Sequence, residues 1–356
     1  MHWLYELAHA QKAGGKLLFA VIMVAGFLAV IGLLLLLIDR VPKRGREKVQ
    51  GFLFLLPAFF LLGIGLVGPI IKTLISSLTS AEVSKKLCVP RPGHVCLIDK
   101  GGAWNNFAHF TWAFTNSDAL HALFNTLRWV VIAPITATVV GLMYAYAIDK
   151  IRGEGLAKSL VFLPTAISFV GAAVIWGLMY QQPSQNGSSG LVNVLLKTVG
   201  LGPINFPTDG KTITYWMIVV MIWIQAGFAT VFLSAAIKGV PAEITEAAKI
   251  DGATEWQAFR RVTIPSIRPT LIVVMVTISI ATLKIFDLVQ TFGADKYGGD
   301  TLANLMFTTY KQAGLGQAAG PLGEHRSAAL AMIIFLLVIP FVIYQVRQMV
   351  KARAGS

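Results

Sequence analysis

The chain has 356 residues, of which 55% are hydrophobic and only 13% are charged, and its mean hydropathy is +0.68. A soluble domain carries about 25% charged residues, so this composition excludes a soluble fold and indicates a polytopic membrane protein. The formal net charge of +13 is therefore a signal of membrane topology, because no basic stripe alternating with aromatic residues points to nucleic acid.

Apolar segments long enough to cross a bilayer, which needs about 20 residues per helix, recur along the whole chain. The first is uninterrupted and lacks a small-residue cleavage site, so we expect a retained helix rather than a signal peptide. The pattern predicts an all-α polytopic membrane protein with about seven transmembrane helices. Their expected positions are residues 17–38, 51–78, 125–148, 158–180, 213–237, 266–289 and 327–346.

The distribution of lysine and arginine predicts the orientation of these helices. Sixteen of these residues lie in segments 39–50, 149–158, 238–268 and 347–356, whereas the alternate segments hold ten across roughly twice the length. Basic loops stay in the cytoplasm. We therefore expect the N-terminus outside, the C-terminus in the cytoplasm, and polar outer loops at residues 80–120, 181–212 and 290–325.

One long polar segment on the basic side, residues 238–265, lies between two apolar segments. Its pattern predicts a helix over residues 242–250 with a face of small apolar residues. Gly252 can end this helix, because glycine adopts the left-handed conformation without steric cost. Thr254 and Gln257 fit a capping box that starts a second helix, which Pro265 and Pro269 would close.

The order of residues in this segment also resembles the EAA loop of ABC-importer permeases. In that family the loop is a coupling helix that docks on a cytoplasmic ATPase. A solvated helical hairpin is the alternative, and the charge distribution disfavours it by placing the loop in the cytoplasm without reference to the family. The resemblance assigns ATPase coupling to Glu246, Ala247, Ala248, Asp251, Gly252, Ala253 and Pro265.

Several further stretches resemble the maltose-type branch of sugar-importer permeases, and are most similar to alpha-glucoside permeases. They are PIIKTLISSL at 69–78, FLPTAISFVGAAVIW at 162–176, WIQAGF at 223–228, IPSIRPTL at 264–271 and LKIFDLV at 283–289. The resemblance covers about residues 51–350 as a six-helix type I permease core, with an extra helix and basic loop at 1–50 and a tail at 351–356. One departure is the outer loop TFGADKYGGD, where such permeases usually have a Thr-x-Gly-Gly-Pro stretch.

The resemblance implies a sugar-transport permease in a bacterial inner membrane, taking up an oligosaccharide or alpha-glucoside. The implied partners are a second homologous permease, a dimer of cytoplasmic ABC ATPases and an extracytoplasmic sugar-binding protein. The chain has no G-x-x-x-x-G-K-[ST] phosphate-binding loop. We therefore expect a transport subunit that is no enzyme and binds no cofactor, with ATP and Mg²⁺ held by the ATPase partner.

Candidates for the substrate path are polar and aromatic residues inside spans, because polar groups in hydrocarbon face a cavity or each other. Aromatic faces with amide and carboxylate groups suit a sugar. Gln225 is favoured because its neutral amide needs a partner, whereas Trp223 is interpreted as a packing residue. Lys284 and Asp287, three residues apart, can instead pair with one another. The candidate set is Trp176, Tyr180, Gln225, Lys284, Phe286 and Asp287.

Cys88 and Cys96 fall in the predicted outer loop 80–120, where a disulfide is permitted. His94 lies between them, but a metal site there lacks a fourth ligand. An ion-coupled secondary transporter of a small polar solute is the alternative function, and it requires carboxylates inside spans and an internal repeat. Only Asp287 meets the first requirement. A membrane-bound enzyme would need a cluster of acid, base or metal-binding residues, which the sequence does not suggest.

Overall fold

The computed structural model describes residues 46–79, 104–183, 189–206, 212–314 and 320–354, together with residues 21, 22, 25, 26, 32 and 210. Residues 1–72 and 73–356 form two compact units. Helices dominate, and the β-pairing within the described residues is limited to one isolated bridge between Thr79 and Trp104. The all-α fold is confirmed. The predicted helix at 17–38 lies almost wholly outside the described residues.

The first unit ends in α3 (Arg46–Leu62) and a π-helical turn, η1 (Gly63–Val67), and the following α4 (Gly68–Leu78) extends past residue 72. Together these elements include an apolar helix over Ala58–Leu78, long enough to cross a membrane. This agrees with the span predicted at 51–78. The π-turn coincides with the glycine-rich sequence GIGLV, where the backbone has little side-chain constraint.

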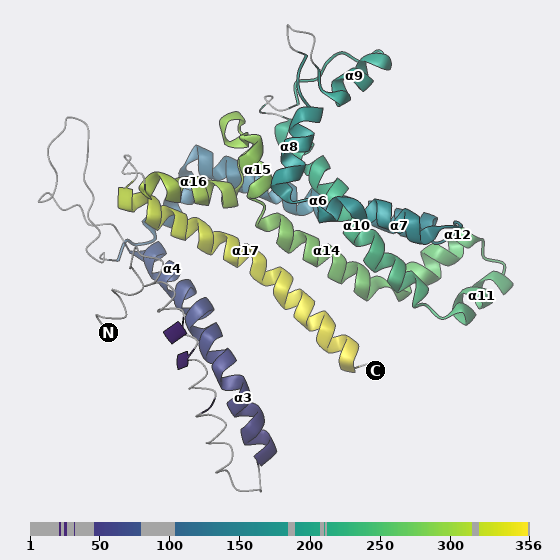
Figure 1. Ribbon diagram of the computed structural model, residues 1–356, viewed down its shortest axis with the longest axis horizontal. Coiled ribbons are helices and arrows are strands. Elements are labelled where there is room, and N and C mark those ends of the chain that lie inside the picture. The colour runs from purple at the N-terminus through teal and green to yellow at the C-terminus, as the bar shows by residue number, and fades with distance from the viewer. Residues whose placement is uncertain are drawn as a thin grey trace, which may run out of the picture. The chain divides into compact units, whose positions relative to one another are not determined.

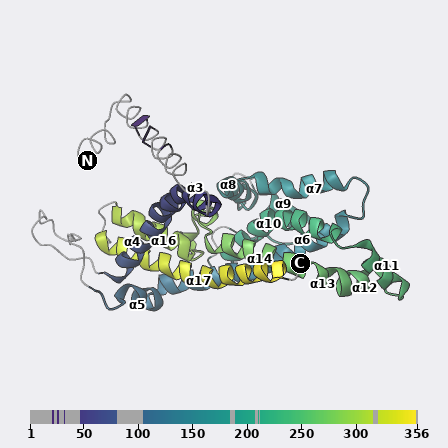
Figure 2. The ribbon, with the colours of Figure 1, turned by 90° about the horizontal axis from the view of Figure 1, so that it is seen from below.

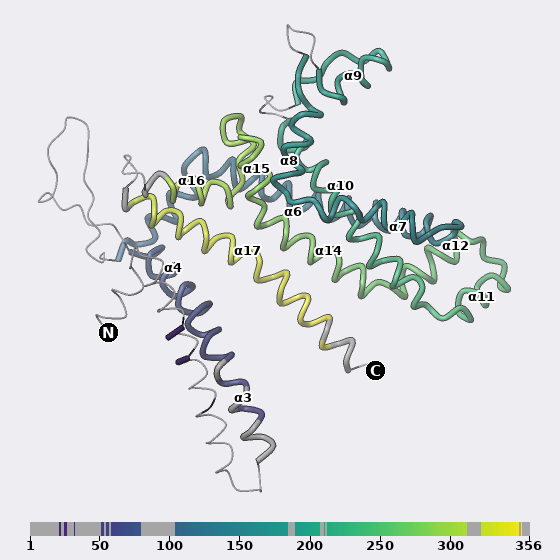
Figure 3. Tube along the Cα trace, viewed as in Figure 1, coloured from purple at the N-terminus to yellow at the C-terminus, as the bar shows by residue number. Residues whose placement is uncertain are grey.

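Two long helices form the centre of the second unit, α6 (Ser117–Ile148) and α10 (Ile213–Lys238), and they run side by side (Figures 1 and 3). Small residues permit the close approach. A Cβ added at Gly141 would lie 2.4 Å from the Cβ of Ala229, and Ala137 and Ala145 are fully buried at the same interface. Between membrane helices, where lipid is as apolar as leucine, such small contacts are the main source of packing.

Helix α6 begins at Ser117, eight residues earlier than the predicted span at 125. The side-chain oxygen of Asn116 accepts hydrogen bonds from the backbone N–H groups of Asp118 and Ala119, at 3.0 and 3.1 Å. This N-cap satisfies donors that would otherwise be unpaired. A short helix, α5 (Ala108–Thr115), precedes it, so helix replaces part of the predicted outer loop 80–120.

One predicted span, 158–180, is interrupted by a sharp bend, and a second sharp bend lies at the start of the span predicted at 266–289. Helix α7 (Glu154–Phe162) with η2 (Leu163–Ala166) meets α8 (Phe169–Met179) at 97°, where Ser168 caps the new helix by accepting the Gly171 N–H at 3.1 Å. The second bend is 70°, between the segment Glu255–Ser266 and α14 (Arg268–Leu283). The described residues therefore contain four helices fit to span a membrane, or up to six if each bent pair is one span.

The outer elements follow these helices. Helix α14 ends at Leu283 rather than at the predicted 289, and α15 (Asp287–Phe292) and η4 (Ala294–Tyr297) come after the break. The short helix α9 (Leu191–Thr198) lies within the outer loop predicted at 181–212, and α16 (Leu302–Gly314) lies within the one predicted at 290–325. The last helix, α17 (Gly320–Ala354), is longer than the span predicted at 327–346.

The two ends of the helical unit differ in what they carry. Figures 1 and 2 agree that α11 (Ala242–Ile250) and α12 (Glu255–Ala258) lie at the end of α10 and α14 remote from α16. This is the end at which the basic segments 149–158 and 238–268 gather. The EAA-like segment and the Gly-rich segment after residue 292 therefore lie at opposite ends of the unit.

Candidate functional site

The EAA-like segment folds as two short helices, α11 and α12, which we name the α11–α12 hairpin (residues 242–258). Gly252 has φ +86°, and its N–H donates to the carbonyl of Lys249 at 3.0 Å, while the Ala253 N–H donates to Ala248 at 3.0 Å. These bonds pair the last carbonyls of α11 in the manner of a glycine C-cap. The predicted helix 242–250 and its glycine stop are confirmed.

The second helix starts as the capping box predicts. Thr254 Oγ1 accepts the Gln257 N–H at 3.3 Å, and Gln257 Oε1 accepts the Thr254 N–H at 2.9 Å. The prediction that Pro265 and Pro269 close this helix agrees with the structure, because the helical segment ends at Ser266, before the bend at Ile267. The chain continues from α12 through a π-helical turn, η3 (Phe259–Thr263), into α13 (Ile264–Ser266), and Pro265 stands in the first turn, where a proline needs no N–H.

The hairpin presents its residues outward. None of the nine residues of α11 is buried. Ile250 is 86% exposed, and Ile244 and Trp256 are each 48% exposed. Apolar side chains displayed on a segment outside the spans mark a surface for another protein. Exposed residues among those the resemblance assigned to coupling are Glu246, Ala247, Asp251, Gly252 and Pro265, and half-buried ones are Ala248 and Ala253.

The inner face of the hairpin packs against the end of α6. Tyr146 of α6 lies 4.2 Å from Phe259 and 5.9 Å from Trp256, measured between ring centroids. The Lys150 ammonium, just after α6, forms an ion pair with Glu255 of α12. An open pocket lies under the hairpin, lined in part by Tyr146, Lys150, Glu255 and Phe259. Sequence reasoning missed this contact, because its partners are over 100 residues apart.

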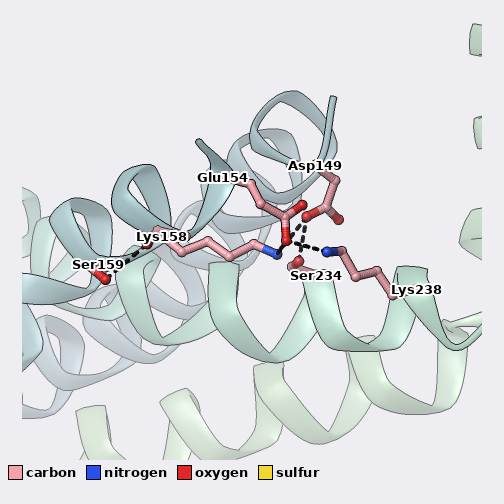
Figure 4. A network of polar contacts seen from close by, with 7 residues as sticks. Asp149, Glu154, Lys158, Ser159, Ser234 and Lys238 are labelled. Carbon is pink, nitrogen blue, oxygen red and sulfur yellow. Dashed lines mark hydrogen bonds and ion pairs between the residues drawn. The ribbon is translucent and has the colours of Figure 1, made fainter. Parts of the chain in front are cut away.

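A network of charged groups joins the ends of α6, α7 and α10 at the same end of the unit (Figure 4). Asp149 accepts a hydrogen bond from Ser234 at 2.6 Å and pairs with Lys158 at 2.7 Å. Glu154 pairs with Lys158 at 3.5 Å and also with Lys238. The only sequence signal for this network was the spacing of Glu154 and Lys158, which lie four residues apart on one helix and can form an ion pair. The network fixes the α6–α7 turn to the last turn of α10, from which the hairpin leaves.

The aromatic substrate-path candidates Trp176 and Tyr180 lie together on α8, with ring centroids 5.2 Å apart. Tyr180 is only 2% exposed, its hydroxyl donates to the Trp216 carbonyl at 3.3 Å, and its ring stacks on Phe206 at 4.8 Å. These contacts make Tyr180 a packing residue. Trp176 packs against Trp223 at 5.6 Å, which agrees with the interpretation of Trp223 as a packing residue.

The other candidates lie on two further elements. Gln225 is half-buried on α10. Lys284 caps the C-terminus of α14 and Asp287 opens α15, and both are exposed. The helix break between them removes the shared helix face on which the predicted pairing depended. Phe286 packs on Phe307 of α16 at 4.5 Å, in a different hydrophobic cluster from Trp176 and Tyr180.

A polar cluster at the opposite end was missed entirely. Asn125 of α6 is 3% exposed, and its amide donates to the carbonyls of Gly298 and Asp300 at 2.8 and 3.0 Å. Asn304 Nδ2 and the Thr301 N–H both donate to the Asp300 carboxylate at 2.8 Å. Burial raises the pKa of Asp300 to about 6, and these two hydrogen bonds oppose the rise. Asn125 and Gly298 are 173 residues apart, so no local sequence pattern could have predicted their hydrogen bond.

The remaining predictions concern cysteines and metals. Cys88 and Cys96 lie outside the described residues. Within the described part of the chain, no group of three or more His, Cys, Asp or Glu side chains is placed to hold a metal ion.

Comparison with known proteins gives a family match over residues 137–355, to the binding-protein-dependent transport system inner membrane component. The chain is 38% identical over 273 residues to the osmoprotective compounds uptake permease protein GgtC of Synechocystis sp., covering 75% of this chain and 94% of GgtC. It is 35% identical over 313 residues to the alpha-glucoside transport system permease protein AglF of Rhizobium meliloti, covering 87% of this chain and 85% of AglF.

Among solved structures, a bacterial alginate ABC transporter, in complex with an alginate-pentasaccharide-bound periplasmic protein, contains a similar chain. The TM-score is 0.66 at 22% identity, covering 86% of this chain and 96% of that chain. At this identity the likeness establishes the fold, which is that of an ABC-importer permease.

Proposed function

Because the chain belongs to the family of binding-protein-dependent transport system inner membrane components, we propose that it carries a sugar across the membrane as one permease of an ATP-driven importer. The observation that carries the proposal is the exposed α11–α12 hairpin, which offers Ile244, Ile250 and Trp256 to a partner. Glu246, Ala247 and Ala248 lie on this surface, where small side chains permit close backbone approach.

The chemistry of the hairpin suits contact with a soluble ATPase. The sequence has no G-x-x-x-x-G-K-[ST] phosphate-binding loop, so the proposal places ATP on a partner that transmits energy through contact with the hairpin. We assign ATP and Mg²⁺ to a dimer of ABC ATPases, one of which docks on the hairpin. Closure of that dimer would move the hairpin and rock the spans between inward- and outward-facing states.

The substrate class is proposed as an oligosaccharide or alpha-glucoside. Support comes from AglF, whose name states alpha-glucoside transport and which matches along 87% of this chain. GgtC, which is 38% identical to this chain, is named for the uptake of osmoprotective compounds. A compatible solute is therefore the competing substrate. A second, homologous permease would complete the central cavity, and an extracytoplasmic binding protein would deliver the sugar.

The orientation follows from the charge distribution. With the hairpin and the basic segments 149–158 and 238–268 in the cytoplasm, the N-terminus lies outside and the C-terminus inside. The Gly-rich segment 293–301 then faces the binding protein. The residues that we still propose for the substrate path are Trp176, Gln225, Lys284, Phe286 and Asp287. Tyr180, buried at the C-terminal end of α8, would support this path by packing.

The testing experiment is purification of the tagged chain from its own membrane, with identification of the proteins that accompany it. The assembly is then reconstituted in proteoliposomes with its binding protein, and ATP hydrolysis is measured with maltose, with trehalose and with glycine betaine. We expect an alpha-linked disaccharide to stimulate hydrolysis and to be taken up only with ATP. Uptake that persists without ATP and follows an ion gradient would support the secondary-transporter alternative instead.

A further inference from the structure

The α11–α12 hairpin is joined to the helical unit by two chain connections, and each contains a break. Gly239 ends α10 before the hairpin, and a bend of 70° at Ile267 separates the hairpin segment from α14. Displacement of the hairpin can therefore be absorbed by rotation at these breaks. A third connection exists through side chains alone, and it leads to α6.

Aromatic packing forms the first part of this third connection. Tyr146 lies on the last turns of α6, and Phe259, which follows α12, is only 4% exposed. Their ring centroids are 4.2 Å apart, and Trp256 lies edge-on to Tyr146 at 5.9 Å. A pair of rings at this distance resists separation and sliding, since close-packed interiors deform little.

An ionic contact forms the second part. The Lys150 ammonium bonds to Glu255, donates to the Tyr146 hydroxyl at 2.8 Å and lies 4.2 Å from the Tyr146 ring centroid. Lys249, at the end of α11, approaches the other oxygen of Glu255 at 3.9 Å. The hydrogen bonds that Lys150 donates to Glu255 and Tyr146 raise the pKa of its ammonium, so it is charged at every physiological pH. Glu255 thus connects both helices of the hairpin to the end of α6.

The far end of α6 reaches the outer segment. The same helix carries Asn125, which holds the carbonyls of Gly298 and Asp300. Asn125 and Tyr146 are separated along the helix by about 30 Å at 1.5 Å per residue. A continuous helix therefore connects the hairpin to the segment that we assign to the opposite side of the membrane.

We propose that Lys150 and Tyr146 are positioning residues that transmit displacement of the α11–α12 hairpin to α6, acting through Glu255 and Phe259. The inference rests on the proposed function, because it assumes that an ATPase moves the hairpin. The proposed role differs from a purely structural one because it does not require the ion pair to stabilise the fold. The side chains of Lys150 and Glu255 are 44% and 65% exposed, and such ion pairs add little to stability. Loss of the pair should therefore leave the fold intact while weakening coupling.

The test uses the complete reconstituted assembly and four variants, K150E, E255K, the double variant K150E/E255K, and R152E. Arg152 is exposed on the same α6–α7 turn, so R152E makes the same charge change away from Glu255. The measured quantity is substrate transported per ATP hydrolysed. We expect K150E and E255K to lower this ratio by about fivefold or more, within the usual range of coupling between sites. E255K should lower the ratio further than K150E, because the new lysine would also repel Lys249. The double variant should recover most of the ratio, and R152E should retain it.

Recovery in the double variant shows that the two charges act as a pair, and a lowered ratio in K150E with an unchanged thermal midpoint is the result that a structural role would not produce. A wild-type ratio in K150E, or no recovery in K150E/E255K, overturns the inference. So does loss of ATPase binding by K150E in a pull-down, since the pair would then serve docking. These failures are distinct from failure of the proposed function, in which the wild-type assembly itself would show no ATP-dependent uptake.

Discussion

The side-chain amide of Asn125 donates a hydrogen bond of 3.0 Å to the backbone carbonyl of Asp300, which lies 175 residues further along the chain. The same amide donates to Gly298, and Thr126 Oγ1 accepts the N–H of Leu302 at 2.9 Å. Two adjacent residues of α6 therefore fix the segment between η4 and α16. The Gly-rich sequence there suggests an irregular exposed loop, but its backbone is anchored to the helical unit.

Substitution of Asn125 by alanine is expected to loosen this segment. The carbonyls of Gly298 and Asp300 lose their donor, and since each such hydrogen bond contributes about 0.5–1.5 kcal/mol, the two together contribute about 1–3 kcal/mol. The free energy of unfolding should fall by about that amount, measured as the thermal midpoint of the purified protein in detergent. His121→Ala, at an exposed position on the same helix, is the control and should change little. Equal midpoints for N125A and H121A would contradict the role of Asn125.

Asp300 should make stability depend on pH in the acid range. Burial raises its pKa to about 6, above the value near 4 of an unfolded aspartate. The folded state therefore holds the proton more tightly, and its contribution to stability is fully present below about pH 4 and is lost as the pH rises to about 6. For a shift of this size the loss is at most about 3 kcal/mol.

The Asp300→Asn variant tests this dependence. An amide keeps the oxygen that accepts from Thr301 and Asn304 but does not titrate, so the slope between pH 4 and 6 should flatten. The measurement is the thermal midpoint of both proteins at intervals from pH 4 to 7. The assignment is wrong if D300N and the wild type have parallel pH profiles.

The sequence predicts elements well where local chemistry determines them. Gly252 and the Thr254–Gln257 capping box define the hairpin within one residue, because glycine conformation and capping bonds act over three or four positions. Hydropathy also locates most spans. It cannot detect the bend at Ser168, because the residues on both sides are apolar, and it places the break after Leu283 inside one span because Lys284 and Asp287 lie within a mostly apolar stretch.

Residues of the site that act through distant contacts could not be predicted from the sequence. Lys150 and Glu255 are 105 positions apart, and only the packing of α6 against the hairpin brings them together. The same holds for Asp149 and Ser234, which are 85 positions apart. Tyr180 shows the converse error, in which the sequence selects a residue that the structure buries. Its residue type suits a sugar site, but only the tertiary structure shows that it packs against Phe206 and Trp216.

Gly252→Pro should uncouple transport while leaving the chain inserted in the membrane. Proline cannot adopt φ +86° and has no N–H to donate to Lys249, so the turn between α11 and α12 must change. We expect loss of ATP-driven uptake with normal amounts of protein in the membrane fraction. Gly252→Asn is the matched control, because asparagine tolerates the left-handed conformation and no atom lies within 4 Å of an added Cβ. Normal uptake by G252P would exclude a coupling role for this turn.

Gly227→Ala tests the contact between α10 and α7. A Cβ at Gly227 would lie 2.3 Å from the carbonyl oxygen of Val161 and 3.2 Å from the Cα of Phe162. Both are backbone atoms, so no side chain can rotate away and α7 itself must shift. Overpacking of this kind costs about 1–3 kcal/mol. The shift would also disturb Glu154 and Lys158, which bind Lys238 and Asp149 at the start of the same helix.

The matched control is Gly177→Ala on α8, where an added Cβ meets nothing within 4 Å. Alanine is the better helix former by about 1 kcal/mol, so G177A should keep or raise the thermal midpoint in detergent. G227A should lower it by a few degrees and reduce uptake. If the midpoint of G227A equalled that of G177A, α7 would have to yield to a backbone clash without energetic cost, and the close packing inferred between α7 and α10 would be incorrect.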